Sequence, residues 1–302
     1  MSSVVPLGPE SVAWRIFSDW RGMLISLWAG SMQNMHPGLG AGVEQHSRFF
    51  EERWERLFRS LYPIAGVVYD GERAAETARR VRDFHRGIGG TDARGRRYHA
   101  LEAGTFFWAH ATFVLTPVLV CEYFGTPLTA AQKERYYAES VRWWRLYGMG
   151  MRPVPADWAA FEAYYDRMCR EVLEVTPAAR AVLDVSDLAR PPALARVPGP
   201  LWRAVAGPAG RGMVWLTTGL YHPAVRERLG LSWSARDERL LRLLGRAVAA
   251  GWRLVPFEYR FHPRARAAWR RARGRGRSGA PLVEAPARYR GGDGARGYAS
   301  EG

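Results

Sequence analysis

The sequence predicts an all-α protein with one large helical domain and a flexible C-terminal tail rich in Arg and Gly. Apolar residues recur at helical spacing along nearly all of the first 262 residues. No run of alternating apolar and polar residues is long enough to indicate a strand. Of the 302 residues, 47% are hydrophobic, which suffices for a large core. We expect the helical domain at residues 8–262 and the tail at residues 263–302.

The first third of the chain predicts five helices in succession. Ser11 is a candidate N-cap for a short helix within residues 9–20. A strongly apolar helix follows and should stop before Pro37, because proline disfavours helix in the residue before it. The next begins at Pro37 itself. An amphipathic helix over 51–70 should be kinked or divided by Pro63, and a helix over 71–89 should end at glycines.

The rest of the domain predicts a loop and then further helices. Residues 91–100 are polar and predict the loop. Residues 101–124 are apolar on all sides, which is typical of a helix at the centre of a domain. The helix after it opens with a capping box formed by Thr129 and Gln132. Four more helical segments are expected, at 155–172, 176–184, 198–220 and 234–254.

The basic charge of the chain is concentrated near its end. The net charge is +15, Lys133 is the only lysine, and residues 260–277 contain eight Arg and no acidic residue. A tail of this composition buries little apolar surface, so we expect it to be flexible. No nucleic-acid-binding motif accompanies it, and we expect no specific nucleic-acid partner. Peripheral contact with an anionic membrane and plain solubility both explain the tail.

The cysteines and the N-terminus indicate a reducing compartment. Cys121 and Cys169 are far apart, and each lies in an apolar helical pattern, so we expect two buried free thiols. The first residues lack the basic and apolar regions of a signal peptide. We therefore expect a cytoplasmic protein. Its oligomeric state is not indicated.

Histidines in apolar segments are the most informative candidates for chemistry. The sequence lacks a dinucleotide fingerprint, a P-loop, a nucleophile elbow and zinc-type cysteine spacing. His85 follows Val81 and Phe84 on an apolar stripe, and His110 lies in the most apolar helix. Each is either a hydrogen-bonded core residue or a ligand. A helix-lined apolar cavity with one or two imidazoles is typical of a haem site, whereas a non-haem iron site would need a nearby carboxylate.

Several motifs, in one order and spacing, closely resemble the MpaB and latex-clearing-protein (rubber oxygenase) family. They are HPGLGAGVEQHSRF, ERWERLFRSL, RRVRDFHRGIGG, FFWAHATFV, LTAAQKERYYAE and LEVTPAARA, and the resemblance covers roughly residues 8–255. It implies an all-α fold around a buried cavity that holds haem b non-covalently. It also implies oxygen-dependent chemistry on a hydrophobic substrate. Rubber oxygenases cleave isoprenoid double bonds, and the MpaB branch cleaves a prenyl side chain at a membrane surface.

The resemblance also implies roles for individual residues. RDFH matches the family's Arg-x-x-His motif, so His85 would be the axial iron ligand and Arg82 would lie one helical turn before it, where it would either meet a haem propionate or belong to a solvated face. RLFRS matches the distal Arg-x-x-Lys-Thr segment through Arg56, Arg59 and Ser60. Arg59 and Ser60 differ from the Lys and Thr of the family's segment, and Arg in place of Lys removes a proton donor of adjustable pKa.

Three further residues complete the expected site. Thr112 matches a threonine near the haem, and His110 is the reserve candidate for the axial ligand. His46 or Ser60 would assist Arg56 on the distal side.

The resulting hypothesis is a haem b-dependent oxygenase that uses dioxygen on a small to medium hydrophobic molecule, either a natural product or an isoprenoid-like compound. A desaturase-type oxidase is a close variant. A haem-binding protein without catalysis, and a non-haem helical scaffold that uses its basic tail, are the alternatives from other functional classes.

Overall fold

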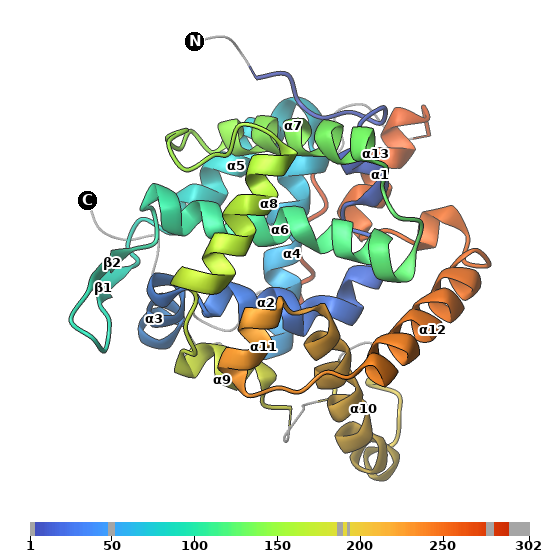
Figure 1. Ribbon diagram of the computed structural model, residues 1–302. Helices are drawn as coiled ribbons and strands as arrows, with labels where there is room; N and C mark the ends of the chain where they lie inside the picture. Colours follow the sequence, from blue (N-terminus) through green and yellow to red (C-terminus); the bar gives the residue numbers. More distant parts are fainter. Residues whose placement is uncertain (1–3, 48–51, 186–189, 192–193, 276–280, 290–302) are drawn as a thin grey trace.

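The computed structural model describes residues 4–47, 52–185, 190–191, 194–275 and 281–289 (Figure 1). It is an all-α fold, as predicted, with one small two-stranded sheet among the described residues. The α-helices are α1 Val12–Ile16, α2 Ser26–Asn34, α3 Pro37–His46, α4 Arg53–Tyr69, α5 Ala74–Asp83, α6 Ala103–Phe124, α7 Ala130–Leu146, α8 Trp158–Arg167, α9 Pro177–Leu183, α10 Gly199–Leu220, α11 Pro223–Leu229, α12 Ala235–Trp252 and α13 Pro263–Ala272.

Helix α6 lies at the centre of the molecule, with other helices around it (Figure 1). Trp108, Val114 and Phe124 on this helix are fully buried, which confirms the expectation from its unbroken apolar sequence. Among the described residues, α6 is the one helix long and apolar enough to cross a membrane, but most of it is buried inside the protein. Burial in the core accounts for its hydrophobicity.

Two local predictions are confirmed at helix ends. Ser11 caps α1 by accepting a hydrogen bond from the Trp14 backbone N–H. Thr129 and Gln132 form the predicted capping box at the start of α7. Both motifs are short-range, so the sequence alone specifies them.

The segment that carries His85 differs from the prediction. Helix α5 ends at Asp83, and the chain turns through residues 84–87. Phe84, expected on the buried stripe, has 51% of its surface exposed. His85 therefore lies in the turn that follows the helix.

The segment expected to be a loop contains a short hairpin. Strand β1, Gly89–Thr91, pairs antiparallel with β2, Arg97–His99, with Gly90 opposite Tyr98. The Tyr98 hydroxyl donates a hydrogen bond to Gln45 Oε1 at 2.7 Å, which ties the hairpin to α3.

The tail does not become flexible at residue 263, contrary to expectation. Helix α13 packs against α4, and its Arg264 has a side chain only 2% exposed. Arg264 donates hydrogen bonds to both carboxylate oxygens of Asp70, at 2.8 and 2.5 Å. Composition did not predict this helix because the charge that neutralises Arg264 lies 194 residues away in the sequence.

A later part of the tail also packs on the helical domain. Tyr289 is buried, and its ring stacks on Phe58 of α4 with ring centroids 4.9 Å apart. Residues 276–280 and 290–302 of the expected tail lie outside the described residues.

Candidate functional site

His85 is held in a defined orientation by one backbone hydrogen bond and one aromatic ring. Its Nδ1 lies 2.8 Å from the Val81 carbonyl oxygen, which can only accept, so Nδ1 carries the proton. The ring of Phe106 meets the imidazole edge to face, with centroids 5.6 Å apart. Burial lowers the pKa of His85, and the nearby charge of Arg56 lowers it further. A neutral imidazole with Nδ1 protonated keeps its lone pair on Nε2.

Aromatic rings continue from His85 into the core. Phe106 packs against Tyr147 and Trp144, with centroids 5.1 and 5.8 Å away. Sequence reasoning missed the contribution of Phe106 and Tyr147. The aromatic run at residues 106–108 was an available signal, but helical spacing does not tell which of its rings faces a residue outside the helix.

His110 lies deeper in this aromatic cluster and has no open side. It is 3% exposed and lies against rings of Phe107, Trp143, Trp144 and Tyr147, at centroid distances between 4.7 and 6.2 Å. Burial lowers the pKa of His110 to about 3, so the ring is neutral. Its buried Nδ1 has no hydrogen-bond partner among the described residues. The structure does not bring His110 together with His85.

Thr112 is fully buried and uses its hydroxyl within the core. Its Oγ1 donates to the Ala109 carbonyl at 2.7 Å and accepts from Gln33 Nε2 at 2.7 Å. The bond from Gln33 joins α2 to α6. Among the described residues, neither hydrogen bond of the Thr112 hydroxyl involves His85 or an arginine.

Of the residues predicted for the distal side, Arg56 is the one whose charge lowers the pKa of His85. It is half-buried on α4, hydrogen-bonds to Ser47 Oγ, and its charge acts on His85. Ser60 lies one turn further along α4 and is half-buried. Arg56 and His85, both predicted from the motif match, therefore lie in the same region of the structure.

Arg59 and Arg82 already have protein partners. Arg59 pairs with Glu52 at 3.5 Å and donates to the Tyr289 carbonyl at 3.2 Å. Arg82 pairs with Asp83 at 2.8 Å and donates to the Tyr147 carbonyl at 3.1 Å. Arg82 thus fastens the His85 turn to the end of α7.

His46 lies on the surface at the end of α3. Its Nε2 is 3.0 Å from the Gly89 carbonyl oxygen in β1. This contact is structural, since it holds the hairpin against α3.

Comparison with known protein families shows to which family the chain belongs. Residues 14–250 match the family described as "ER-bound oxygenase mpaB/B'/Rubber oxygenase, catalytic domain". The chain belongs to this family. Membership makes it an oxygenase-type catalytic domain with a small-molecule substrate and dioxygen as reactants. No curated protein and no solved structure matches the chain.

A metal site built from protein ligands alone is not found in the described ranges. No three His, Cys, Asp or Glu side chains there lie together in an arrangement that could hold a metal ion. A haem iron differs in its needs, because the porphyrin supplies four nitrogen ligands and the protein supplies an axial one.

Proposed function

We propose that the protein is a haem b-dependent oxygenase that acts on a small to medium hydrophobic molecule, and that His85 would hold the haem iron. The observation that carries the proposal is the hydrogen bond from His85 Nδ1 to the Val81 carbonyl. Histidines that ligate metals through one ring nitrogen typically donate the other N–H to a backbone carbonyl or a carboxylate. That bond fixes both the tautomer and the orientation of the ring.

The surroundings of His85 fit a haem group in two respects. The imidazole is neutral, as a ligand must be, because burial and Arg56 lower its pKa. Phe106 gives the site an apolar wall, and the nearby Arg56 gives it positive charge, whereas Arg82 is already paired with Asp83. When bound, haem would supply an iron centre able to activate dioxygen.

His110 is the weaker candidate for the axial ligand. Four aromatic rings surround it, and its environment holds the pKa near 3. A ligand role would require several of these rings to move. The enclosed position supports a packing role for His110 inside the aromatic cluster.

Arg56 is the residue best suited to stabilise negative charge in the reaction. Its guanidinium is permanently charged and can donate hydrogen bonds to an oxygen atom on which charge develops. Ser60 on the same helix offers a hydroxyl. Phe106 covers one face of the His85 ring, and Tyr147 packs against Phe106. The contacts of His46 and Thr112 support structural roles, so Arg56 and Ser60 remain as the proposed distal groups.

The test is haem reconstitution of three proteins. Wild type mixed with haemin should show a Soret band with one haem per chain. His85→Ala should lose or shift this band, and added imidazole should restore it. The control is His99→Ala, an exposed histidine whose Nε2 lies 3.2 Å from the Arg86 carbonyl, and its spectrum should match wild type. A wild type without a Soret band, or a His85→Ala spectrum identical to wild type, would refute the proposal.

A further inference from the structure

A second candidate site lies at the opposite end of α6 from His85. A surface hollow of about 420 Å³ is bounded by the last turns of α6, by α8, by the α10–α11 junction and by the start of α12. Tyr123 on its wall is 17 residues after Phe106 on α6, which corresponds to roughly 25 Å along a helix. The hollow is therefore separate from the His85 region.

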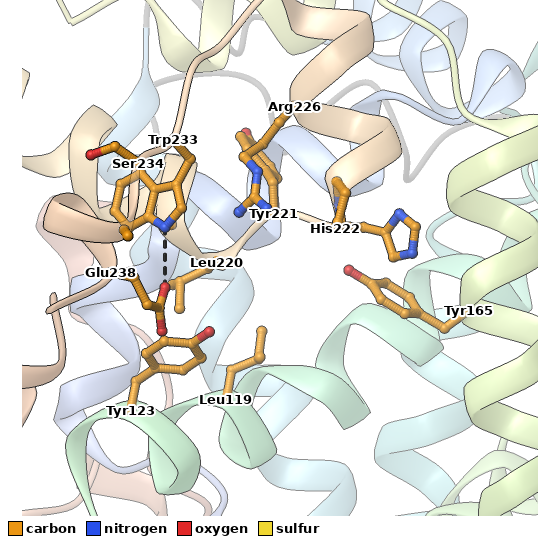
Figure 2. A pocket seen from close by; sticks show the side chains of 13 residues that line it. Leu119, Tyr123, Tyr165, Leu220, Tyr221, His222, Arg226, Trp233, Ser234 and Glu238 are labelled. Carbon is orange, nitrogen blue, oxygen red and sulfur yellow. Dashed lines mark hydrogen bonds between the residues drawn. The ribbon is translucent and has the colours of Figure 1, made fainter.

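The walls of the hollow are mainly aromatic and apolar. Figure 2 shows Tyr123 and Trp233 on one side and Tyr165 and His222 on the other, with open space between them. Leu119 and Leu220 also line the hollow. Burial raises the pKa of Tyr123 and of Tyr165, so both phenols keep their protons, and the Tyr165 hydroxyl is hydrogen-bonded to the Cys169 side chain. Such walls suit a flat apolar ligand that carries a polar group.

Both carboxylate oxygens of Glu238 are engaged by protein groups. Its Oε1 accepts from Arg242 Nε at 2.9 Å and its Oε2 accepts from Trp233 Nε1 at 3.1 Å. The dashed line in Figure 2 marks the second of these bonds. Arg242 pairs with this carboxylate and also with Glu122, at 3.1 Å, so it offsets the charge of Glu238 only in part.

His222 is also engaged by the protein. Its Nε2 lies 3.0 Å from Asp166 Oδ1, and its Nδ1 accepts a hydrogen bond from the Ala224 N–H at 3.2 Å. Both ring nitrogens therefore already have partners.

Arg226 is the group on the wall that lacks a partner. It is half-buried and lines the hollow, but its guanidinium forms no hydrogen bond or ion pair with any described residue. The guanidinium is reached by solvent from the hollow, and a bound anion would replace that water with a charge-assisted hydrogen bond. The planar fork of arginine matches a carboxylate with two parallel hydrogen bonds.

We propose that this hollow binds a carboxylate joined to a flat apolar or aromatic body, with Arg226 holding the carboxylate. The body would lie between Tyr123 and Tyr165, against Leu119. A monoanion fits better than a phosphate dianion, because a single unpaired cation is available and the Glu238 carboxylate lies on the same wall. The site is independent of haem.

The test is isothermal titration of the purified protein with 1-naphthoate. Arg226→Gln should weaken binding roughly 10–100-fold, the usual effect of losing a charge-assisted hydrogen bond. The matched control is Arg246→Gln, an exposed arginine on α12 outside the hollow, which should bind as wild type does. The neutral analogue 1-naphthalenemethanol should bind Arg226→Gln and wild type equally.

A second variant tests whether the probes bind in the hollow without changing Arg226. Leu119→Trp would fill the hollow and should abolish binding of both probes while the circular dichroism spectrum stays unchanged. His85→Ala should bind 1-naphthoate normally, so failure of the haem proposal would not affect this result. Absence of 1-naphthoate binding to wild type, or equal affinity in Arg226→Gln, would overturn the proposal.

Discussion

Replacing Arg264 tests whether the start of the basic tail belongs to the folded domain. In the native protein the Arg264 and Asp70 side chains are 2% and 0% exposed, and two hydrogen bonds join them. In Arg264→Met the Asp70 carboxylate would stay buried with only the Thr77 hydroxyl as a hydrogen-bond partner from this cluster. Breaking a buried ion pair by removing one partner typically costs about 3–5 kcal/mol. We expect a loss of this size in the free energy of unfolding.

Urea unfolding at pH 7, followed by circular dichroism, measures this loss. The control is Arg270→Gln on the same helix, whose pair with Glu258 at 3.1 Å is solvent-exposed. It should change stability by no more than about 1 kcal/mol. Adding Asp70→Asn to Arg264→Met should recover part of the loss, because it removes the uncompensated charge. A loss below about 1 kcal/mol in Arg264→Met would refute the reasoning.

Two further predictions concern helix packing and pH. A Cβ at Gly245 would lie 1.9 Å from the Tyr123 carbonyl oxygen, so Gly245→Ala should force α12 away from α6 and cost about 3 kcal/mol in thermal unfolding. Gly251→Ala, with nothing within 4 Å, is the control and should be neutral or stabilising; similar losses in both would contradict the packing argument. Burial lowers the pKa of His110 to about 3, so below about pH 6.5 the unfolded chain binds a proton that the folded chain does not. Stability should therefore fall as the pH falls from about 6.5 toward 3, and this residue should account for about 2 kcal/mol by pH 5. His110→Phe should show a loss between pH 7 and pH 5 that is smaller by this amount, whereas parallel stability profiles would rule the mechanism out.

The sequence predicted the features of the fold that depend on local chemistry. The capping box at Thr129 and the burial of α6 follow from neighbouring residues alone. The end of α5 was missed because Phe84 continues the apolar period although it faces solvent. The order of α13 was missed because it depends on Asp70, a distant residue. For the candidate site, the order of the motifs predicted that Arg56 and His85 belong to one site. It could not predict that aromatic side chains enclose His110, because those side chains come from different helices.

The hollow near Arg226 had no signal in the sequence. Its walls come from α6, α8, α11 and α12, and no motif joins those segments. Because arginine is common throughout this chain, a single arginine in the sequence does not indicate a binding site. Only packing reveals that Glu238 has a partner and that Arg226 has none within the part of the chain that the structure describes.

The pairing of Asp70 with Arg264 has a consequence for how the chain is made. Ribosomes add about 5–20 residues per second, and the two residues are 194 positions apart. Asp70 therefore leaves the ribosome roughly 10–40 seconds before its partner exists. Until then, helices α4 and α5 cannot close over this carboxylate without leaving its charge unpaired. The core around Asp70 should thus be completed late in synthesis, and a nascent chain stalled before residue 264 should remain sensitive to protease at α4 and α5.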